Sequence, residues 1–314
     1  MSTEGDTDRS VQVLQLSDVH MVEAGDLYGR DPAETLDAVC RDVRERGLRP
    51  DIAVVTGDLV HDGSVAGYER LGSALAELGV PVYCVAGNHD FVQPLEAGLP
   101  RPGVHLERLV RLGDWQFVFL DSNANGWQEV EPGHRRDASD RYLRAVTGSV
   151  HPGDRAWLAG VLDTTSAAHV FVWLHHPPVA PADYAGLARP EFRDPLFAVL
   201  GRPVVRAVAG GHLHTSWEGA LDGIRVFACP STWLAMDFEA MTTAPPGYRW
   251  YRLDPSGAVE AATYHVTDGR WASREALPPW TVKMIAGDFD HQAVEGMAQD
   301  DIIAGFGASS SEHP

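Results

Sequence analysis

The sequence predicts an α/β fold with its functional residues at the carboxyl ends of parallel strands. Between residues 11 and 90, short apolar runs alternate with stretches of helical spacing, which is the pattern of βαβ units. Three of the apolar runs end in polar residues, at Asp18, Asp58 and Asn88. Because parallel strands bring their carboxyl ends to one edge of a sheet, we expect these residues to converge.

The composition is that of a globular protein with a substantial core. The chain has 314 residues, of which 44% are hydrophobic and 22% charged, so neither global disorder nor a membrane class is indicated. No apolar run approaches the roughly 20 residues that a membrane-spanning helix needs. The start of the chain is polar and does not look like a signal peptide, so we expect a cytoplasmic protein. Cys40, Cys84 and Cys229 lack metal-like spacing and are expected to be buried thiols in a reducing compartment.

The charge of the chain restricts its partners. A formal net charge of −19 argues against a nucleic-acid polymer or an anionic membrane surface as the main partner. The same charge would repel a phosphate ester unless strongly cationic groups lie at the site. Because clustered lysines and arginines are few, bound divalent metal ions would supply that positive charge.

The first strand-like run, residues 11–16, alternates apolar and polar side chains, as a half-buried strand does. Asp18 and His20 follow it, two residues apart, and would point to the same side of an extended chain. A carboxylate and an imidazole that project together are a good start for a metal site.

A helix is expected between about Asp31 and Gly47, with Asp31 as its N-cap and Gly47 as its stop. The apolar run 51–56 follows and predicts a second strand, which ends at Asp58. A strand, a helix and a strand form a βαβ unit, so the sheet should be parallel and the crossover right-handed.

The next unit ends in the tetrapeptide Gly-Asn-His-Asp at residues 87–90. Helical spacing around residues 68–78 precedes the apolar run 80–86, which the glycine stops. Asn88 and His89 therefore lie at the carboxyl end of a predicted strand, where α/β enzymes place their sites.

The rest of the chain is less regular. Further elements are expected as follows: strands at 116–120, 169–174 and 204–209, a helix at 153–162 and a long loop up to about residue 140. Strand-like runs without helical spacing then occupy 224–228, 248–253 and 258–266. These last runs predict either a second, more antiparallel sheet or an antiparallel edge.

Histidines follow two of these later strands. His175 and His176 stand before two prolines, and His212 and His214 face the same way if the segment is extended. Because neighbouring residues of a strand point to opposite faces, only one of His175 and His176 can easily reach a shared metal site.

The predicted strand ends supply oxygen and nitrogen donors without a thiolate: Asp18, His20, Asp58, Asn88, His175 or His176, His212 and His214. Such donors suit manganese, iron, zinc or cobalt better than a closed structural zinc site. They are too many for one ion, but with one carboxylate bridging they suit two ions about 3.5–4 Å apart. Two such ions activate a water molecule and hold the oxygens of an in-line displacement at phosphorus.

The blocks around these donors resemble the calcineurin-like metallophosphoesterases, and most closely the bacterial class III cyclic-nucleotide phosphodiesterases: Asp18-Val19-His20, Gly57-Asp58, Gly87-Asn88-His89-Asp90, His175-His176-Pro177-Pro178 and Gly211-His212-Leu213-His214. They follow the family's order over roughly residues 11–265. The resemblance implies a four-layer αββα sandwich with two central mixed β-sheets. We expect a catalytic domain over 11–266, a flexible N-terminus over 1–10, and a C-terminal extension over 267–314 that is partly disordered at its end.

The resemblance also implies how the metal ions are held. Two divalent or trivalent ions, manganese, iron or zinc, would each have four ligands: Asp18, His20, Asp58 and His214 for one, and Asp58, Asn88, His175 and His212 for the other. His175 is thereby favoured over His176. His89 would not bind metal but would contact the phosphate, beside Asn88, and assist departure of the leaving alkoxide.

The expected function is hydrolysis of a small phosphodiester, 3′,5′-cyclic AMP first among the substrates to test, by attack of a metal-bound hydroxide. A phosphomonoesterase or glycerophosphodiesterase with the same metal centre is the alternative, because function on a shared fold depends on pocket residues. A scaffold that has lost catalysis is a third reading, opposed by the filled ligand positions. No nucleic-acid polymer and no membrane is expected as a partner, and a homodimer is left open.

Several further polar residues have no assigned role as a ligand or an acid. The remaining histidines are expected on the surface or in support of the site, among them His61, His105, His151 and His291. Asp62 and Asp90 could orient ligands through hydrogen bonds or cap helices. Asp288 follows a strand-like run and a glycine, as Asp58 does, but no ligand is missing there, so we interpret it as a turn or cap residue.

Overall fold

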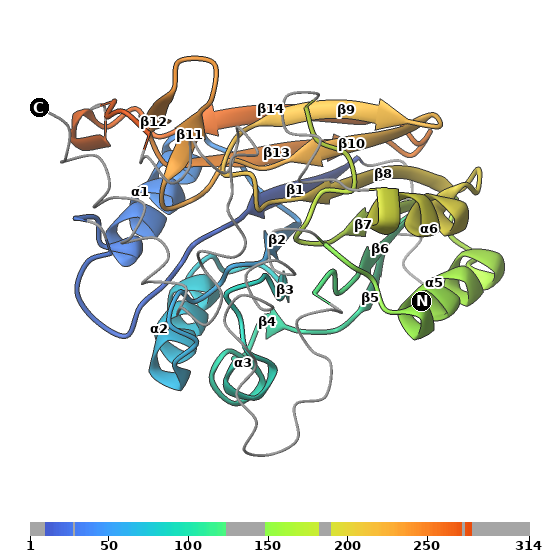
Figure 1. Cartoon of the computed structure of the whole chain (residues 1–314), viewed down its shortest axis with the longest axis horizontal. Helices are drawn as coiled ribbons and strands as arrows, with labels where there is room; N and C mark the ends of the chain where they lie inside the picture. Colours follow the sequence, from blue (N-terminus) through green and yellow to red (C-terminus); the bar gives the residue numbers. More distant parts are fainter. Residues whose placement is uncertain (1–9, 28, 124–147, 182–189, 272–273, 278–314) are drawn as a thin grey trace, which may run out of the picture.

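The computed structural model describes residues 10–27, 29–123, 148–181, 190–271 and 274–277. Two six-stranded sheets pack against each other, and helices cover their outer faces, α1 and α2 on one side and α5 and α6 on the other (Figure 1). The expected four-layer αββα sandwich is confirmed. Residues 1–9 and 278–314 lie outside the described part, and the domain boundaries stay predictions.

The first sheet has the strand order β14-β13-β1-β2-β3-β4. Its strands are β1 (Val11–Leu16), β2 (Ile52–Thr56), β3 (Val82–Val85), β4 (Val104–His105), β13 (Gly247–Leu253) and β14 (Val259–His265). Strands β1 to β4 are parallel, whereas β13 runs antiparallel to β1 and β14 antiparallel to β13. The connecting helices are α1 (Pro32–Glu45), α2 (Val65–Ala76) and α3 (Val92–Gly98).

The second sheet has the order β5-β6-β7-β8-β10-β9. Its strands are β5 (Leu109–Leu112), β6 (Trp115–Phe119), β7 (His169–Trp173), β8 (Val205–Gly210), β9 (Trp217–Leu221) and β10 (Ile224–Ala228). Strands β6, β7, β8 and β10 are parallel, and both edges are antiparallel. The remaining elements are α5 (Pro152–Thr164), α6 (Pro190–Leu200), the hairpin β11 (Ala235–Asp237) and β12 (Thr242–Ala244), and a short 3-10 helix (Gly269–Trp271).

The local signals in the sequence explain the first βαβ unit. Asp31 caps α1, because its Oδ1 accepts a hydrogen bond from the Ala33 amide at 2.9 Å, and Gly47 follows the helix at a φ of 70°. Both expectations are confirmed. Helix α2 begins three residues before the expected start at Tyr68, since Ser64 caps it by accepting from the Gly67 amide.

The late strands settle the alternative that the sequence left open. Strands β13 and β14 form an antiparallel edge of the first sheet beside β1, and β10 joins the second sheet parallel to β8. A separate antiparallel sheet is therefore wrong for these segments. The short strands β4, β5 and β9 and the helix α3 were not expected, because each is too short or too irregular for a clear period. The expected loop up to residue 140 lies largely outside the described residues.

An aromatic core joins the two sheets. Phe171 stacks on Trp173 with ring centroids 4.1 Å apart, and the ring of Tyr251 meets both edge-on at 5.3 and 5.5 Å. All three side chains are fully buried. Such pairs add about 0.5–1.5 kcal/mol each beyond their buried area. This core therefore holds the two sheets, and with them the ends of their strands, in one fixed arrangement.

The cysteines and the helices agree with the class that the composition indicates. Cys40, Cys84 and Cys229 are buried free thiols, as expected, and burial raises the pKa of each. Among the described residues, no helix combines the length and the apolar character that crossing a membrane requires.

Candidate metal centre

The predicted ligand residues converge at the carboxyl ends of the central strands. The loops after β1, β2 and β3 supply Asp18, His20, Asp58 and Asn88, and the segments after β7 and β8 supply His175, His212 and His214. These loops are the β1 loop (residues 17–22), the β2 loop (residues 57–62) and the β3 loop (residues 86–91). Both sheets contribute, so the centre lies where the two layers meet.

The backbone at this edge is left-handed at the ligand positions. Positive φ angles of 47–65° occur at Asp18, His20, Asp58, His212 and His214. This region costs a non-glycine residue about 1–2 kcal/mol, although Asp and His enter it more readily than most. Asp18 and His20 therefore do converge, but on left-handed backbone and not in the extended chain that the sequence suggested. His212 and His214 do the same. Residues in such conformations cluster at functional sites.

Hydrogen bonds between loops hold this backbone in place. The Asp18 amide donates to the Gly57 carbonyl at 3.0 Å, and the His20 amide donates to the Asp58 carbonyl at 2.9 Å. Both carboxylate oxygens of Asp18 accept from the His212 amide, at 3.1 and 3.0 Å. Segments from both sheets are thereby tied to one another around the ligands.

One group of donors surrounds Asp18 and His20. Ligand atoms of Asp18, His20, Asp58 and His214 all lie within 4.8 Å of one another, and all four residues are buried or nearly so. The Nε2 of His214 is 3.2 Å from the Nε2 of His20 and 3.4 Å from Oδ1 of Asp18. Four oxygen and nitrogen donors directed at one point form a set that could hold a metal ion.

A second group lies on the other side of Asp58. The Oδ1 of Asn88 is 3.0 Å from Nε2 of His175 and 3.0 Å from Nδ1 of His212. Oδ1 of Asp58 is 3.4 Å from Nε2 of His175, whereas its Oδ2 is 3.5 Å from Nε2 of His20. The two oxygens of this carboxylate thus face different donor groups.

Hydrogen bonds behind the imidazoles fix which nitrogen faces the centre. Nδ1 of His175 lies 2.8 Å from the Thr56 carbonyl, and Nδ1 of His214 lies 2.9 Å from the Leu234 carbonyl. Because a carbonyl only accepts, each Nδ1 must carry the proton and donate it. The Nε2 lone pair of both rings is left for a metal ion, as in metal sites generally.

His176 has a different environment from His175. Its Nδ1 is 2.9 Å from the hydroxyl of Ser122, and its amide donates to the same hydroxyl. The ring nonetheless lies beside the centre, since its centroid is 4.5 Å from that of His212 and a nitrogen of His176 groups with those of His175 and His212. Of the two neighbours, His175 is the one that contacts Asp58 and Asn88.

Two glycines of the motifs make room for the ligands. A Cβ at Gly87 would lie 2.1 Å from the Asp58 amide nitrogen, and one at Gly211 would lie 1.8 Å from Oγ of Ser17 and 2.5 Å from Oδ2 of Asp18. No side chain fits at such distances. The glycines are therefore required by the close approach of the loops, and their place in the sequence motifs has a packing reason.

Asp90 ties the β2 loop to the β3 loop. Its carboxylate accepts from the amides of Leu59, Val60 and Gly87 at 2.7–3.1 Å and from the hydroxyl of Tyr68 at 2.8 Å. Burial, with the nearby charge of Asp58, raises the pKa of Asp90 to about 7. Of the two expected roles, support of the site is the one that the structure shows, because α3 begins after Phe91 without a side-chain cap. Asp62 instead accepts from the amide of Ser64 just before α2.

Burial sets the protonation of the centre. It lowers the pKa of His20, His212 and His89, because desolvation disfavours the protonated form of each imidazole. Burial alone would raise the pKa of Asp58, but the imidazoles of His175, His89 and His20 hold it well below its usual range. The carboxylate at the middle of the centre is thus ionised.

Comparisons with known proteins show the family to which the chain belongs. The sequence model of the family described as calcineurin-like phosphoesterase matches residues 11–216. The 3′,5′-cyclic adenosine monophosphate phosphodiesterase CpdA of Pseudomonas aeruginosa is 32% identical over 273 residues, which cover 83% of this chain and 92% of that protein. The chain belongs to the calcineurin-like phosphoesterase family. A cAMP/cGMP dual specificity phosphodiesterase of Mycobacterium tuberculosis is 32% identical over 251 residues, 76% of this chain and 71% of that protein.

Solved structures resemble this phosphoesterase in fold. A dimetal phosphatase from Danio rerio has a TM-score of 0.56 at 16% identity and covers 83% of this chain and 100% of its own. The purple acid phosphatase PPD1 of yellow lupin has a TM-score of 0.53 at 13% identity, over 85% of this chain and 53% of its own. At these identities the likeness supports the four-layer fold and nothing finer.

The donors of this phosphoesterase fit a metal centre. They are carboxylate, amide and imidazole groups, and the Nδ1 atoms of His175 and His214 are already hydrogen-bonded to backbone carbonyls on the side away from the centre. Buried carboxylates and neutral imidazoles are costly to desolvate unless a cation or hydrogen bonds compensate them. The donor chemistry that the sequence predicted is therefore present in the folded chain.

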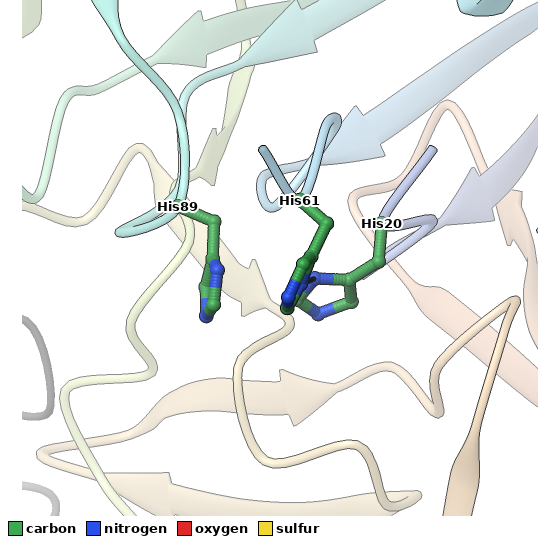
Figure 2. A group of neighbouring side chains, drawn as sticks. All are labelled: His20, His61 and His89. Carbon is green, nitrogen blue, oxygen red and sulfur yellow. Dashed lines mark hydrogen bonds between the residues drawn. The ribbon is translucent and has the colours of Figure 1, made fainter. Parts of the chain in front are cut away.

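His61 is the site residue that the sequence motifs missed. It lies at the centre with His20 and His89, and ring nitrogens of the three residues fall within 4.8 Å of one another (Figure 2). The sequence placed it on the surface or in support of the site, without a role. Its position three residues after Asp58, in the same β2 loop, was the signal that could have singled it out.

Two other described histidines outside the motifs lie away from the centre. His105 on β4 pairs with Glu107 at 3.3 Å and stacks on Tyr83, and His151 caps α5 by accepting from the Gly153 amide. His291 and Asp288 lie outside the described residues, so the interpretation of Asp288 as a turn residue stays a prediction.

Proposed function

We propose that this phosphoesterase is a dinuclear metal-dependent phosphodiesterase and that 3′,5′-cyclic AMP is its substrate. The observation that supports two ions is the orientation of Asp58, whose Oδ2 faces His20 and whose Oδ1 faces His175. A carboxylate between two donor groups can bridge two metal ions. The substrate is inferred from the relatives, whose names describe cyclic-nucleotide phosphodiesterases.

The proposed ligand sets divide the donors at this carboxylate: Asp18, His20, Asp58 and His214 for one ion, and Asp58, Asn88, His175 and His212 for the other. Oxygen and imidazole donors without thiolate suit manganese, iron or zinc. When bound, two such ions would neutralise the phosphate and promote ionisation of a water molecule for in-line attack at phosphorus. They would also offset the net charge of −19, which otherwise disfavours an anionic substrate.

His89 is proposed as the acid for the leaving oxygen. Its amide donates to Oδ1 of Asp58 at 2.9 Å, which fixes the β3 loop against the centre, and its half-buried imidazole lies 4.8 Å from the ring of His20. In its protonated form, which the negative charge of a bound phosphate favours, an imidazole so placed can give a proton to the alkoxide that leaves a cyclic phosphate. Asn88, next to it, is proposed to face the phosphate with its amide group.

The test replaces Asp58, the proposed bridging carboxylate, and leaves the other proposed ligands unchanged. After chelation, activity on 3′,5′-cyclic AMP and on bis-p-nitrophenyl phosphate should return with Mn²⁺, Fe²⁺ or Zn²⁺. Asp58→Ala should lower kcat/KM by about 1,000-fold, because metal ions supply several kcal/mol of transition-state stabilisation and each 1.4 kcal/mol is a factor of ten. Asp62→Ala is the matched control: it removes an exposed carboxylate of the same loop, and kcat/KM should change less than about threefold.

Three outcomes would contradict the proposal. A wild-type rate in Asp58→Ala would remove the bridging carboxylate from the mechanism. Less than one metal ion per chain under replete conditions would instead indicate a scaffold that has lost catalysis. A higher kcat/KM on p-nitrophenyl phosphate or on glycerophosphocholine than on 3′,5′-cyclic AMP would keep the metal chemistry and reassign the substrate.

A further inference from the structure

His61 reaches the centre because the β1 and β2 loops run side by side. The Met21 amide donates to the Leu59 carbonyl at 2.9 Å, and the His61 amide donates to the Met21 carbonyl at 2.9 Å. This parallel pairing continues the register of β1 and β2 beyond the sheet. The rings of His61 and His20 consequently lie with centroids 5.3 Å apart.

The first contact of His61 is with a proposed metal ligand. The Nδ1 of His61 is 3.2 Å from the Nδ1 of His20, which is a hydrogen-bond distance. On its other side, His20 directs Nε2 toward His214 and Asp58, at 3.2 and 3.5 Å. If Nε2 gives its lone pair to a metal ion, the proton of His20 sits on Nδ1. His20 then donates the hydrogen bond and Nδ1 of His61 accepts it.

This acceptor differs from those behind the other ligands. The corresponding Nδ1 of His175 and of His214 donates to a backbone carbonyl, of Thr56 and of Leu234. A backbone acceptor cannot be removed by substitution of its residue, whereas the His61 imidazole can. His20 is therefore the one of these three ligands whose supporting hydrogen bond depends on a side chain.

The second contact of His61 is with the proposed acid. The His61 and His89 rings stack, with centroids 4.9 Å apart and planes inclined by 25° (Figure 2). The ring of His89 also hydrogen-bonds to the backbone carbonyl of His61. The stacking depends on the His61 side chain, and the carbonyl bond does not, so the two can be separated by substitution.

We infer that His61 is a positioning residue that orients the metal ligand His20 through Nδ1 and the acid His89 by stacking. This inference rests on the proposed function for the roles of His20 and His89. A third metal ion bound by these three imidazoles is disfavoured. His20 would have to lose its ring proton and, as an imidazolate, bind one metal ion through each nitrogen. One side chain thus supports both metal binding and protonation of the leaving oxygen.

Two substitutions separate the two contacts. His61→Phe keeps an aromatic ring for stacking but has no acceptor for His20, whereas His61→Asn keeps an acceptor near the place of Nδ1 but has no ring. The matched control is His105→Phe, which replaces a half-buried, stacked histidine remote from the centre. Each variant is compared with the wild type in melting temperature, and His61→Leu replaces His61→Phe if the latter does not fold.

The first readout is Mn²⁺ affinity without substrate, from the paramagnetic resonance signal of the free ion. His61→Phe should bind Mn²⁺ about 10–100-fold more weakly, which is the usual effect of removing a hydrogen-bond partner of a metal ligand. His61→Asn and His105→Phe should stay within about threefold of the wild type. Equal affinity in His61→Phe and the wild type, or loss of a whole metal equivalent per chain, would overturn the role assigned to Nδ1.

The second readout is kcat at saturating metal on two esters. In His61→Asn, kcat on 3′,5′-cyclic AMP should fall at least tenfold more than kcat on bis-p-nitrophenyl phosphate, because an alkoxide needs an acid and p-nitrophenolate leaves without one. An equal fall on both esters would overturn the role assigned to stacking. A wild type that hydrolyses neither ester would refute the proposed function, while the Mn²⁺ result would still test the contact with His20.

Discussion

The middle of the molecule, between the two sheets, and the carboxyl ends of the parallel strands differ sharply in this phosphoesterase. In the middle, Phe171 stacks on Trp173 and Tyr251 meets both rings edge-on, and all three residues belong to β-strands. At the ends, a few residues further along, buried carboxylates and imidazoles sit on left-handed backbone. The apolar region contributes the favourable free energy that allows the strained, polar region to persist. Stability and chemistry should therefore respond to different substitutions.

The largest expected effect is on stability, in the middle region. Phe171→Ala removes a fully buried ring between the sheets and should lower the free energy of unfolding by about 3–5 kcal/mol. Denaturant unfolding, followed by circular dichroism, measures this change. The fraction that remains folded should keep kcat/KM within a few-fold of the wild type. A loss below about 1 kcal/mol would mean that the intersheet core is not the main source of stability.

The second-largest expected effect is a fall in kcat/KM caused by a substitution at the strand ends. Gly211→Ala would force a Cβ to within 1.8 Å of Oγ of Ser17 and 2.5 Å of Oδ2 of Asp18, so the loop carrying His212 must shift. A displacement of about 1 Å at a catalytic site can cost about 100-fold in rate, which is the expected fall in kcat/KM.

Gly160→Ala is the control for that substitution. Gly160 is exposed on α5 with nothing within 4 Å of an added Cβ, so the change should stabilise the protein by about 0.5–1 kcal/mol and leave kcat/KM unaltered. If both glycine variants kept full activity, the close packing at Gly211 would not govern the site.

The smallest effect is expected from a substitution that lies outside both the intersheet core and the proposed metal-binding strand ends. Arg252 on β13 pairs with Glu260 on β14 at 3.1 Å, and both side chains are about half exposed or more. Arg252→Ala should cost less than about 1 kcal/mol, because exposed ion pairs contribute little. Melting temperature and kcat/KM would both stay near the wild type. A tenfold loss of activity here would show that chemistry does not depend on the strand ends alone.

The sequence predicted the parallel part of the fold well. Residues 11–90 carry strong local signals, an alternating or apolar strand followed by a capped helix, and both expected units formed. The runs 248–253 and 258–266 carried equally clear strand signals, but their place stayed open. The run 248–253 pairs with β1, near the other end of the chain, and the run 258–266 pairs with 248–253. The alternation of side chains within one strand does not show which strand pairs with it.

The ligand residues could likewise be predicted by type and not by geometry. Asp18 and Asp58 stood out because a carboxylate directly after a buried strand has few structural reasons to be there. The left-handed backbone at Asp18 and His20 could not be predicted from the sequence, since φ angles depend on the contacts between loops. Asp90 was recognised as a supporting residue, but its four donors come from three separate segments.

By itself, the sequence determined which chemical groups stand at the strand ends, because strand period and helix signals are local and the motifs follow them directly. Only the tertiary structure decided which atoms meet. The two oxygens of Asp58 face different donor groups because β2 lies between β1 and β3 while the second sheet closes over its end. His61 stands behind His20 because two loops pair beyond the sheet. Such contacts join residues that are distant along the chain, and no local pattern encodes them.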